Sequence, residues 1–347
     1  MIQRTAARIE ARQQDNESPT WQQLLADSIT SPDALLQALG LSPDAWLSGA
    51  HEGHALFPVR VPLPYLARIE PGNPADPLLR QILPMADEAR FQAGYVRDPL
   101  QEASATATTG LIRKYRSRAL LMVTGQCAIN CRYCFRRHFP YADHRLSPED
   151  RKQVITSLKD SPEINEVIFS GGDPLAVNDR LLARWVEALD DLPQLRRLRI
   201  HTRLPVVIPQ RVNNELLSWV SKTRLKVIMV VHVNHANELD QATRSSLARL
   251  AAAGVTLLNQ SVLLHGVNDD ADTLCELSEA LFSTGVLPYY LHAFDPVEGA
   301  HHFDVPDARA RQLAREMIAR LPGFLVPRLV REIPGREGKT PLNLNAE

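Results

Sequence analysis

The sequence predicts an α/β fold, a partial (β/α)6 barrel of the TIM type with an N-terminal helical cap and a C-terminal tail. Short apolar runs rich in β-branched residues recur, and after the first run their starts lie about 30 residues apart, the length of one β–α unit. Helical patterns separate the runs, and polar residues follow them. This alternation indicates a parallel sheet curled into a barrel, and six units rather than eight leave one side open. The six predicted strands are 119–124, 166–170, 196–201, 226–232, 255–261 and 286–292.

Residues 1–100 precede the barrel, and their pattern predicts short helices and turns that cap it. In TSPDALLQALG, Ser31 is the expected N-cap and Pro32 the first helical residue, and a glycine ends the segment. The segment LSPDAWLSG repeats this pattern with Ser42 and Pro43. No catalytic pattern is found in this region.

Between the predicted strands, the apolar residues recur with the period of a helix. The segments 238–254 and 272–285 each place their apolar residues near one face. Each ends in a glycine, which is typical of a helix C-terminus. The apolar positions are Leu239, Leu247, Leu250 and Ala251 in the first segment and Leu274, Leu277 and Leu281 in the second.

The composition is that of a globular protein of 347 residues, of which 44% are hydrophobic and 23% are charged. The formal net charge is −1, which argues against nucleic acid as a partner. The first residues lack the apolar core of a secretory signal, and no run approaches the ~20 apolar residues of a membrane span. These features predict a cytoplasmic protein without a membrane segment.

Polar residues follow five of the six predicted strands. In barrels of this type the active site lies at the C-terminal ends of the strands. Ordinary loop polarity would explain one such end, but five together favour a site. The polar ends are 170–173, 201–203, His232, Gln260 and 292–295.

Three of the four cysteines, Cys127, Cys131 and Cys134, lie within eight positions in the loop after the first predicted strand. This is a poor disulfide framework and a good metal site. A structural zinc site needs four ligands; His138 could be the fourth, but the spacing fits no common zinc pattern. A [4Fe–4S] cluster usually takes four thiolates, so three would leave one iron open to another ligand. Cys275 falls in the apolar pattern of a later helix, and we interpret it as a small core residue.

The spacing C-x3-C-x2-C, with Tyr133 before the last cysteine, resembles that of the radical S-adenosylmethionine (radical SAM) enzymes. The resemblance implies that the three cysteines ligate a [4Fe–4S] cluster whose open iron binds the amino and carboxylate groups of SAM. An electron from the cluster would then cleave SAM to a 5′-deoxyadenosyl radical. The segment SGGDP resembles the family's contact with the methionine moiety and implies that Gly171, Gly172 and Asp173 bind this cofactor. A tight turn would explain the same glycines equally well.

Lys339, in PGREGKTPL, is the second informative position. A phosphate loop is excluded because its first glycine would stand at Ile333 and no strand–loop–helix frame surrounds it. A lone lysine here would be interpreted as a solvated tail residue. Together with the cysteines and the barrel, however, GKTP resembles the lysine 2,3-aminomutase family, in which this lysine forms a Schiff base with pyridoxal phosphate. The resemblance runs from about residue 74 to 344 and includes, in order, NPADPLLRQILP, KYRSRALL, CRYCFRR, SGGDP, LRIHTRLPVVIP, VNHANE, NQSVLLHGVND and PYYLHAFD.

The resemblance implies three regions: an N-terminal helical cap at 1–100, the radical SAM partial barrel at 101–305, and a C-terminal helix and tail at 306–347 that holds pyridoxal phosphate through Lys339. It also implies a role for further residues. Lys114 stands where the family usually has arginine, so the charge is kept but the bidentate fork is lost. Glu332 stands where the family has aspartate, which keeps the charge on a longer side chain. The implied contacts are Lys114, Tyr115 and Arg118 with the phosphate of pyridoxal phosphate, Arg136 with the substrate carboxylate, His232 and Gln260 with SAM, and Asp295 and Glu332 with the substrate's side-chain ammonium.

The acidic pair favours lysine as substrate, because two carboxylates suit a cationic end. The implied activity is that of an isomerase converting L-α-lysine to β-lysine, with R the expected hand, through the 5′-deoxyadenosyl radical and a pyridoxal phosphate aldimine. The electron donor would be a flavodoxin or ferredoxin. A homo-oligomer is expected. Zinc is not expected, because longer family members bind it in a cysteine-bearing C-terminal extension, whereas this chain ends at Glu347 with no cysteine after Cys275. The short form resembles the aminomutase that supplies β-lysine for the modification of elongation factor P.

Two alternatives stay open. In the first, the chain is a radical SAM enzyme for another amino acid, or one in which Lys339 is incidental and no pyridoxal phosphate binds. In the second, it is a binding protein with structural zinc at the cysteines. A radical enzyme in which Lys339 is incidental predicts cluster-dependent SAM cleavage without bound pyridoxal phosphate, and activity that survives replacement of Lys339 by alanine. The zinc-binding protein would be colourless and retain zinc.

Overall fold

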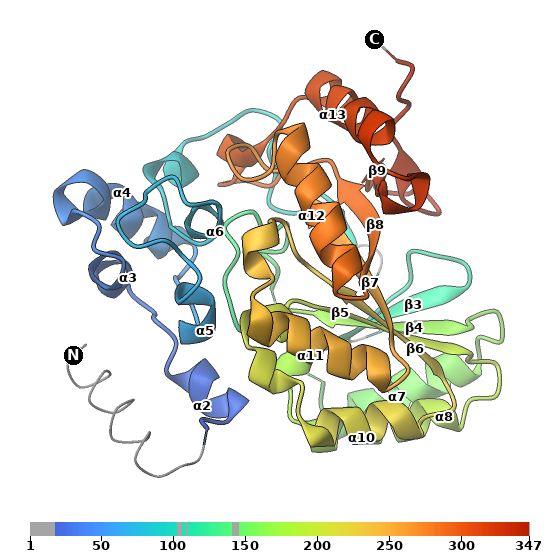
Figure 1. Cartoon of the computed structure of the whole chain (residues 1–347). Coiled ribbons are helices and arrows are strands. Elements are labelled where there is room, and N and C mark those ends of the chain that lie inside the picture. The colour runs from blue at the N-terminus through green and yellow to red at the C-terminus, as the bar shows by residue number, and fades with distance from the viewer. Residues whose placement is uncertain (1–17, 103–105, 109, 141–145, 347) are drawn as a thin grey trace.

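The computed structural model describes residues 18–102, 106–108, 110–140 and 146–346. Within these ranges, ten strands form one sheet in chain order from β1 to β10. The strands from β3 to β9 are parallel, and the antiparallel strands β1, β2 and β10 extend the two edges. Because β1 and β10 do not pair within the described ranges, the curled sheet stays open, as a partial barrel requires (Figure 1). The strands are β1 (Thr106–Thr108), β2 (Leu111–Ile112), β3 (Arg118–Thr124), β4 (Glu166–Gly171), β5 (Arg197–Thr202), β6 (Lys226–Val231), β7 (Thr256–Val262), β8 (Leu287–His292), β9 (Arg328–Arg331) and β10 (Thr340–Pro341).

The predicted α/β fold is confirmed, because all six predicted strands are present as β3 to β8, with ends within one residue of those expected. The sequence analysis missed β9, which continues the parallel sheet beside β8 with Tyr290 opposite Arg328 and His292 opposite Val330. It also missed β10, which turns back along β9. The residues at 328–331 are RLVR, and so short and half-charged a run gives almost no strand signal.

The residues of the parallel strands reflect how each strand is buried. Every residue of β4 is buried, because a strand in a parallel sheet is covered on both faces. In β5, buried and partly exposed residues alternate. Since alternate side chains share a face, Arg199 and His201 point to the same side, and both line the interior of the barrel.

Helices cover the outer face of the sheet (Figure 1). The helix predicted at 272–285 is present and buries its three predicted leucines, together with Cys275. The helix predicted at 238–254 is shorter: Leu239 precedes it, and Ala251 is exposed because it lies past the edge of the buried stripe. The α-helices are α2 (Trp21–Ala26), α3 (Pro32–Ala38), α4 (Pro43–Leu56), α5 (Leu63–Leu66), α6 (Pro77–Arg80), α7 (Pro148–Lys159), α8 (Asp179–Asp190), α9 (Leu204–Val207), α10 (Asn214–Lys222), α11 (Gln241–Ala252), α12 (Ala271–Ser283) and α13 (Asp307–Arg320), and the 3-10 helices are η1 (Ala86–Ala89), η4 (Pro174–Ala176), η5 (Pro209–Arg211), η6 (Ala236–Glu238), η7 (His301–Phe303) and η8 (Gly323–Leu325). None of the helices in the described ranges is long and apolar enough to cross a membrane.

The helices α2 to α6 lie together beside the barrel (Figure 1). Ser31 caps α3 as predicted, with its hydroxyl accepting from the Ala34 amide at 3.2 Å. Ser42 makes no such bond, and α4 does not stop at Gly49 but continues to Leu56. Gly49 has a packing role instead, because a Cβ there would lie 2.9 Å from the backbone nitrogen of Ala86 in η1.

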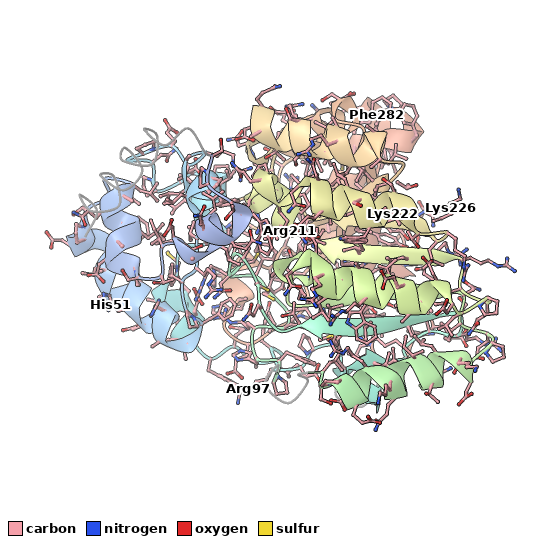
Figure 2. All side chains as sticks on the ribbon, turned by 90° about the horizontal axis from the view of Figure 1, so that it is seen from below. His51, Arg97, Arg211, Lys222, Lys226 and Phe282 are labelled. Atoms are coloured by element: carbon pink, nitrogen blue, oxygen red, sulfur yellow. The ribbon has the colours of Figure 1, made fainter. Side chains whose placement is uncertain are left out.

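Buried ion pairs join these helices to the barrel. Arg132, between the second and third cysteines, is fully buried and donates to Glu88 of η1 and to the carbonyl of Phe57 at 2.6 Å. Arg137 donates to the same carboxylate at 2.6 Å. Arg211 (Figure 2) pairs with Asp179 within the barrel at 2.9 Å, and its guanidinium lies over the Trp21 ring of α2, 4.7 Å from the centre.

Replacement of Glu88 by alanine is expected to lower the free energy of unfolding by about 3–5 kcal/mol, because it leaves two buried guanidinium groups without their carboxylate. The measurement is urea unfolding followed by circular dichroism. Glu163→Ala is the matched control, since its carboxylate is half exposed and pairs with Arg113 at the surface. The control should lose no more than about 1 kcal/mol. Equal losses in the two variants would contradict the assigned role of Glu88.

Candidate active site

A cavity of about 230 Å³ opens at the C-terminal ends of the parallel strands and extends into the barrel. Every residue that the sequence analysis singled out as a site residue lines this cavity, including those that precede β3 and those that follow β8. The structure therefore brings the predicted residues together, while their individual roles stay predictions. They are Lys114, Tyr115, Arg118, Cys127, Cys131, Cys134, Arg136, Gly171, Gly172, Asp173, His232, Gln260, Asp295, Glu332 and Lys339.

The three cysteines lie in the loop that follows β3 and face the cavity. Burial and the neighbouring thiols raise the pKa of Cys134 to about 11 and that of Cys127 well above its usual value. A metal that binds thiolate would reverse this preference for the protonated form. Within the described ranges, no three His, Cys, Asp or Glu side chains are grouped as ligands of one metal ion. Cys275 lies apart from the cavity in a separate apolar cluster, as predicted for a core residue.

The glycines of SGGDP allow close contact between two backbones. A Cβ on Gly171, whose φ is +119°, would lie 2.3 Å from the carbonyl oxygen of Thr124. The amide of Gly172 donates to this same oxygen at 2.8 Å. Glycine is therefore needed to hold the end of β4 against the end of β3, from which the cysteine loop starts.

Asp173 borders the cavity, but its carboxylate is engaged by the protein. It accepts from the Thr202 hydroxyl at 2.6 Å and from the amides of Leu175, Arg203 and Leu204 at 3.0, 2.8 and 3.0 Å. These bonds fix the turn after β4 to the turn after β5. Asp173 thus supports the glycine loop from behind.

Arg136 forms a bidentate ion pair with Glu102, with contacts of 2.6 and 2.9 Å. It also donates to the Ser170 hydroxyl at 3.0 Å. Lys114 donates to the same Glu102 carboxylate at 2.9 Å. Burial acts to raise the pKa of Glu102, but Arg136 and Lys114 outweigh it and lower the pKa to about 2. Arg136 and Lys114 thus already bind one carboxylate, that of Glu102, and their positive charges suit anionic ligands.

Lys339 lies in the hairpin between β9 and β10, and its ammonium pairs with Glu332 at 2.8 Å. Glu332 also accepts from the Tyr115 hydroxyl at 2.9 Å. Although burial acts to raise it, Lys339 holds the pKa of Glu332 below its usual value. The Arg118 guanidinium stacks on the Tyr115 ring, 4.0 Å from its centre. The hairpin therefore joins the predicted cofactor lysine to the predicted phosphate contacts.

Several buried polar atoms around the cavity have no hydrogen-bond partner in the described part of the chain. They include Oδ1 of Asp295, Oε1 of Gln260 and Nε2 of both His201 and His292. Burial lowers the pKa of His232 to about 4, so its ring is neutral near pH 7. Buried groups of this kind indicate a site built for polar ligands.

The sequence analysis gave no role to five charged or histidine side chains of this cavity. Arg203, His201 and His292 were noted only as polar strand ends, and Glu102 has no local pattern that would mark it. Arg199 could have been found, because charged residues at alternate positions of a parallel strand must face the barrel interior. These residues are Glu102, Arg199, His201, Arg203 and His292.

The donor set fits the three groups that the sequence analysis expected. Three thiols on one loop suit an iron–sulfur cluster. The described residues that line the cavity include six Lys or Arg side chains against four carboxylates, which suits a phosphate and an amino acid carboxylate. The unpartnered Asp295 oxygen suits an ammonium group.

Comparison with known proteins agrees with these features. Residues 121–277 match the model of the Radical SAM superfamily. The chain is 48% identical over 324 residues to L-lysine 2,3-aminomutase of Escherichia coli, with 93% of this chain and 94% of that protein covered. It is 47% identical over 324 residues to L-lysine 2,3-aminomutase of Haemophilus influenzae, with coverage of 93% and 96%. For the protein of that name from Buchnera aphidicola, the identity is 44% over 330 residues, with coverage of 95% and 97%. The chain therefore belongs to the lysine 2,3-aminomutase family of the radical SAM superfamily, as its cysteine and GKTP motifs predicted.

Proposed function

We propose that this protein is an isomerase, a lysine 2,3-aminomutase that converts L-α-lysine to β-lysine. One observation carries the proposal: Lys339, the cysteine triad and the two carboxylates Glu332 and Asp295 line the same cavity. Neither a zinc-binding protein nor a radical enzyme without an amine-binding cofactor requires this combination.

The residues present would hold three groups. Cys127, Cys131 and Cys134 would hold the [4Fe–4S] cluster. The loop at Gly171, Gly172 and Asp173 would bind SAM, together with His232 and Gln260. Lys339 would hold pyridoxal phosphate, and Lys114, Tyr115 and Arg118 would bind its phosphate. When bound, these groups supply an electron, a hydrogen-abstracting radical and a carbonyl that carries the migrating nitrogen.

The chain's own residues would position lysine between these groups. Arg136 would bind its carboxylate, and Asp295 and Glu332 its side-chain ammonium. Glu332 now pairs with Lys339. Once Lys339 is engaged with the cofactor, Glu332 would be free to turn to the substrate.

The cavity would also protect the reaction from water. Leu120, Ile168, Val207 and Phe294 form part of its wall. Their apolar side chains exclude solvent from the reacting atoms and strengthen the ion pairs that orient the substrate. Orientation and exclusion are what a radical reaction requires of the protein.

The apparent affinity for lysine is expected to rise with pH through about 7. Burial raises the pKa of Asp295 to about 7, with Lys339 opposing the rise and Glu332 adding to it. Below this pH the carboxyl is neutral and attracts an ammonium weakly, and above it the carboxylate is ionised. Asp295→Asn should raise the KM for lysine about 10- to 100-fold and remove this dependence.

The same shift bears on stability. Because the folded pKa lies above the unfolded value of about 4, ionisation of Asp295 opposes folding, and stability falls as pH rises from about 4 through 7. Asp295→Asn should therefore be more stable than the wild type at neutral pH. Asp272→Asn is the control for both measurements, because this side chain is exposed on α12. A KM that varies with pH equally in all three proteins would rule out Asp295 as the ammonium contact.

The test of the function is anaerobic incubation of the reconstituted protein with L-lysine, SAM, pyridoxal phosphate and dithionite. Products are separated by chiral chromatography. Formation of β-lysine that requires all four additions supports the proposal. Cleavage of SAM without β-lysine would contradict the choice of lysine and favour another amino acid.

Finer features belong to the same proposal. We expect the R hand for β-lysine, use of the product to modify elongation factor P, a flavodoxin or ferredoxin as electron donor, and a cytoplasmic location as a homo-oligomer. Four free cysteines suit a reducing compartment. The chromatography that detects β-lysine also decides its hand.

A further inference from the structure

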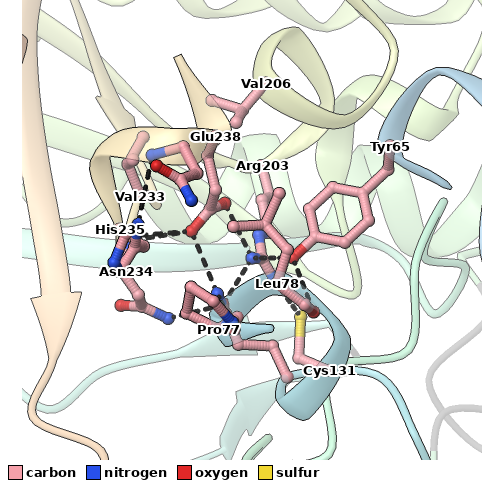
Figure 3. Close-up of polar contacts among 12 residues, drawn as sticks. Tyr65, Pro77, Leu78, Cys131, Arg203, Val206, Val233, Asn234, His235 and Glu238 are labelled. Carbon is pink, nitrogen blue, oxygen red and sulfur yellow. Dashed lines mark hydrogen bonds and ion pairs between the residues drawn. The ribbon is translucent and has the colours of Figure 1, made fainter. Parts of the chain in front are cut away.

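Arg203, directly after β5, lies against the thiol of one predicted cluster ligand. Its Nη1 donates to Sγ of Cys131 at 2.8 Å (Figure 3). The side chain is 6% exposed, so this contact is shielded from water. Its Nε has no hydrogen-bond partner among the described residues. The contact with the sulfur therefore depends on Nη1 alone.

A buried network fixes the direction of the guanidinium. Its Nη2 donates to Glu238 at 2.8 Å and to Oε1 of Gln81 at 2.7 Å, and lies 3.4 Å from the Tyr65 hydroxyl (Figure 3). Glu238 in turn accepts from the Asn234 amide at 2.9 Å. With Nη2 held on one side, Nη1 is aimed at Cys131.

The partners come from separate parts of the chain. Tyr65 and Gln81 belong to the N-terminal region, Arg203 to the barrel and Glu238 to η6. A residue that needed only to satisfy Glu238 would not have to reach a thiol. The packing of these parts therefore does not explain why Nη1 of Arg203 contacts Sγ of Cys131.

We propose that Arg203 is a positioning residue that sets the reduction potential of the [4Fe–4S] cluster through its N–H···S bond to Cys131. The inference rests on the proposed cluster. Reduction adds one electron to a group already carrying three thiolate charges, and hydrogen bonds to the ligand sulfurs together with nearby positive charge favour the reduced state. Glu238 neutralises much of the guanidinium charge at a distance, so the directed N–H···S bond is the larger part of the effect.

The test compares the redox midpoints of four proteins after anaerobic reconstitution, without lysine or SAM. Dithionite is the one-electron donor, and the reduced cluster is quantified by electron paramagnetic resonance. Arg203→Met removes the hydrogen bond and keeps the apolar stem. Arg203→Met combined with Glu238→Gln removes the bond without leaving a buried charge. Tyr65→Phe is the matched control, since it loses a contact to the guanidinium but leaves Nη1 on the sulfur.

We expect both Arg203 variants to hold a full complement of iron and sulfide and to have more negative midpoints. At the potential where half of the wild-type cluster is reduced, the ratio of reduced to oxidised cluster should fall about tenfold, which corresponds to 59 mV for one electron. Tyr65→Phe should keep the wild-type ratio. The double variant guards against misfolding of the single one, because it leaves no unpaired buried carboxylate.

The outcomes separate this inference from the proposed function. A wild type that assembles no cluster would contradict the function. Clusters that assemble in all proteins with unchanged midpoints would contradict only the role of Arg203. A midpoint that falls in Arg203→Met but returns to the wild-type value in the double variant would show that the unpaired buried charge of Glu238, and not the loss of the bond to sulfur, is responsible, and would also overturn the inference.

Discussion

Lys339→Ala is expected to abolish formation of β-lysine, with a loss of at least about 10³-fold, the scale seen when a covalent catalytic group is removed. Its ammonium lies 2.8 Å from Glu332 and over the Tyr290 ring, 5.6 Å from the centre. Alanine removes the amine that would hold pyridoxal phosphate and leaves the cysteine loop untouched. The variant should therefore keep its cluster and lose its retained cofactor. Iron content and the absorbance of pyridoxal phosphate after gel filtration measure the two separately.

Lys226→Ala is the matched control for this experiment. Lys226 begins β6 at the end of the strand opposite the cavity, and its side chain is exposed (Figure 2). This variant should keep both activity and bound cofactor. If Lys339→Ala were as active as Lys226→Ala, the lysine would be incidental and the chain would be a radical enzyme without pyridoxal phosphate. Retained SAM cleavage in both variants is expected on either view, so β-lysine is the decisive product.

The sequence was sufficient to predict the strands β3 to β8 because burial selects apolar residues in them. After a charged first residue, β3, β4 and β6 are mostly apolar, and in β5 apolar residues alternate with charged or polar ones. Glycines follow α11 and α12, the two helices predicted between them. The hairpin of β9 and β10 has no such apolar pattern. Its four-residue first strand is half charged, and its position depends on pairing with β8, which local sequence does not encode.

Some residues of the candidate site could likewise be predicted from the sequence, and others could not. Residues with a chemical spacing, such as the cysteine triad, could be named from the sequence and are found at one cavity. Glu332 and Lys339 are seven positions apart in the chain, and the hairpin is what joins them. Partners distant in sequence could not be predicted, because nothing local marks them. Arg203 and Cys131 are 72 positions apart, and Arg136 and Glu102 are 34 apart.

Cys134→Ser is expected to prevent assembly of the cluster and, with it, all cleavage of SAM. Each of the three thiolates is required when only three are available, and a serine hydroxyl is a much weaker ligand for iron. Cys275→Ser is the matched control: the same atom is exchanged in a buried side chain of α12 that lies in a separate apolar cluster, away from the cavity. Iron and sulfide content and the visible absorbance of the cluster are the measurements. The control should reconstitute like the wild type.

The same pair of variants decides between the cluster and structural zinc. A zinc site at these cysteines would give colourless proteins, and Cys134→Ser would then lose zinc and stability without any change in absorbance. A cluster gives a coloured wild type, a coloured Cys275→Ser and a colourless Cys134→Ser. Because Cys134 faces the same cavity as Lys339, loss of the cluster should also abolish β-lysine while pyridoxal phosphate stays bound. If Cys134→Ser loses the cluster but keeps pyridoxal phosphate, and Lys339→Ala keeps the cluster but loses pyridoxal phosphate, the two groups are held separately. Loss of β-lysine in both variants would then establish that both groups act on one substrate.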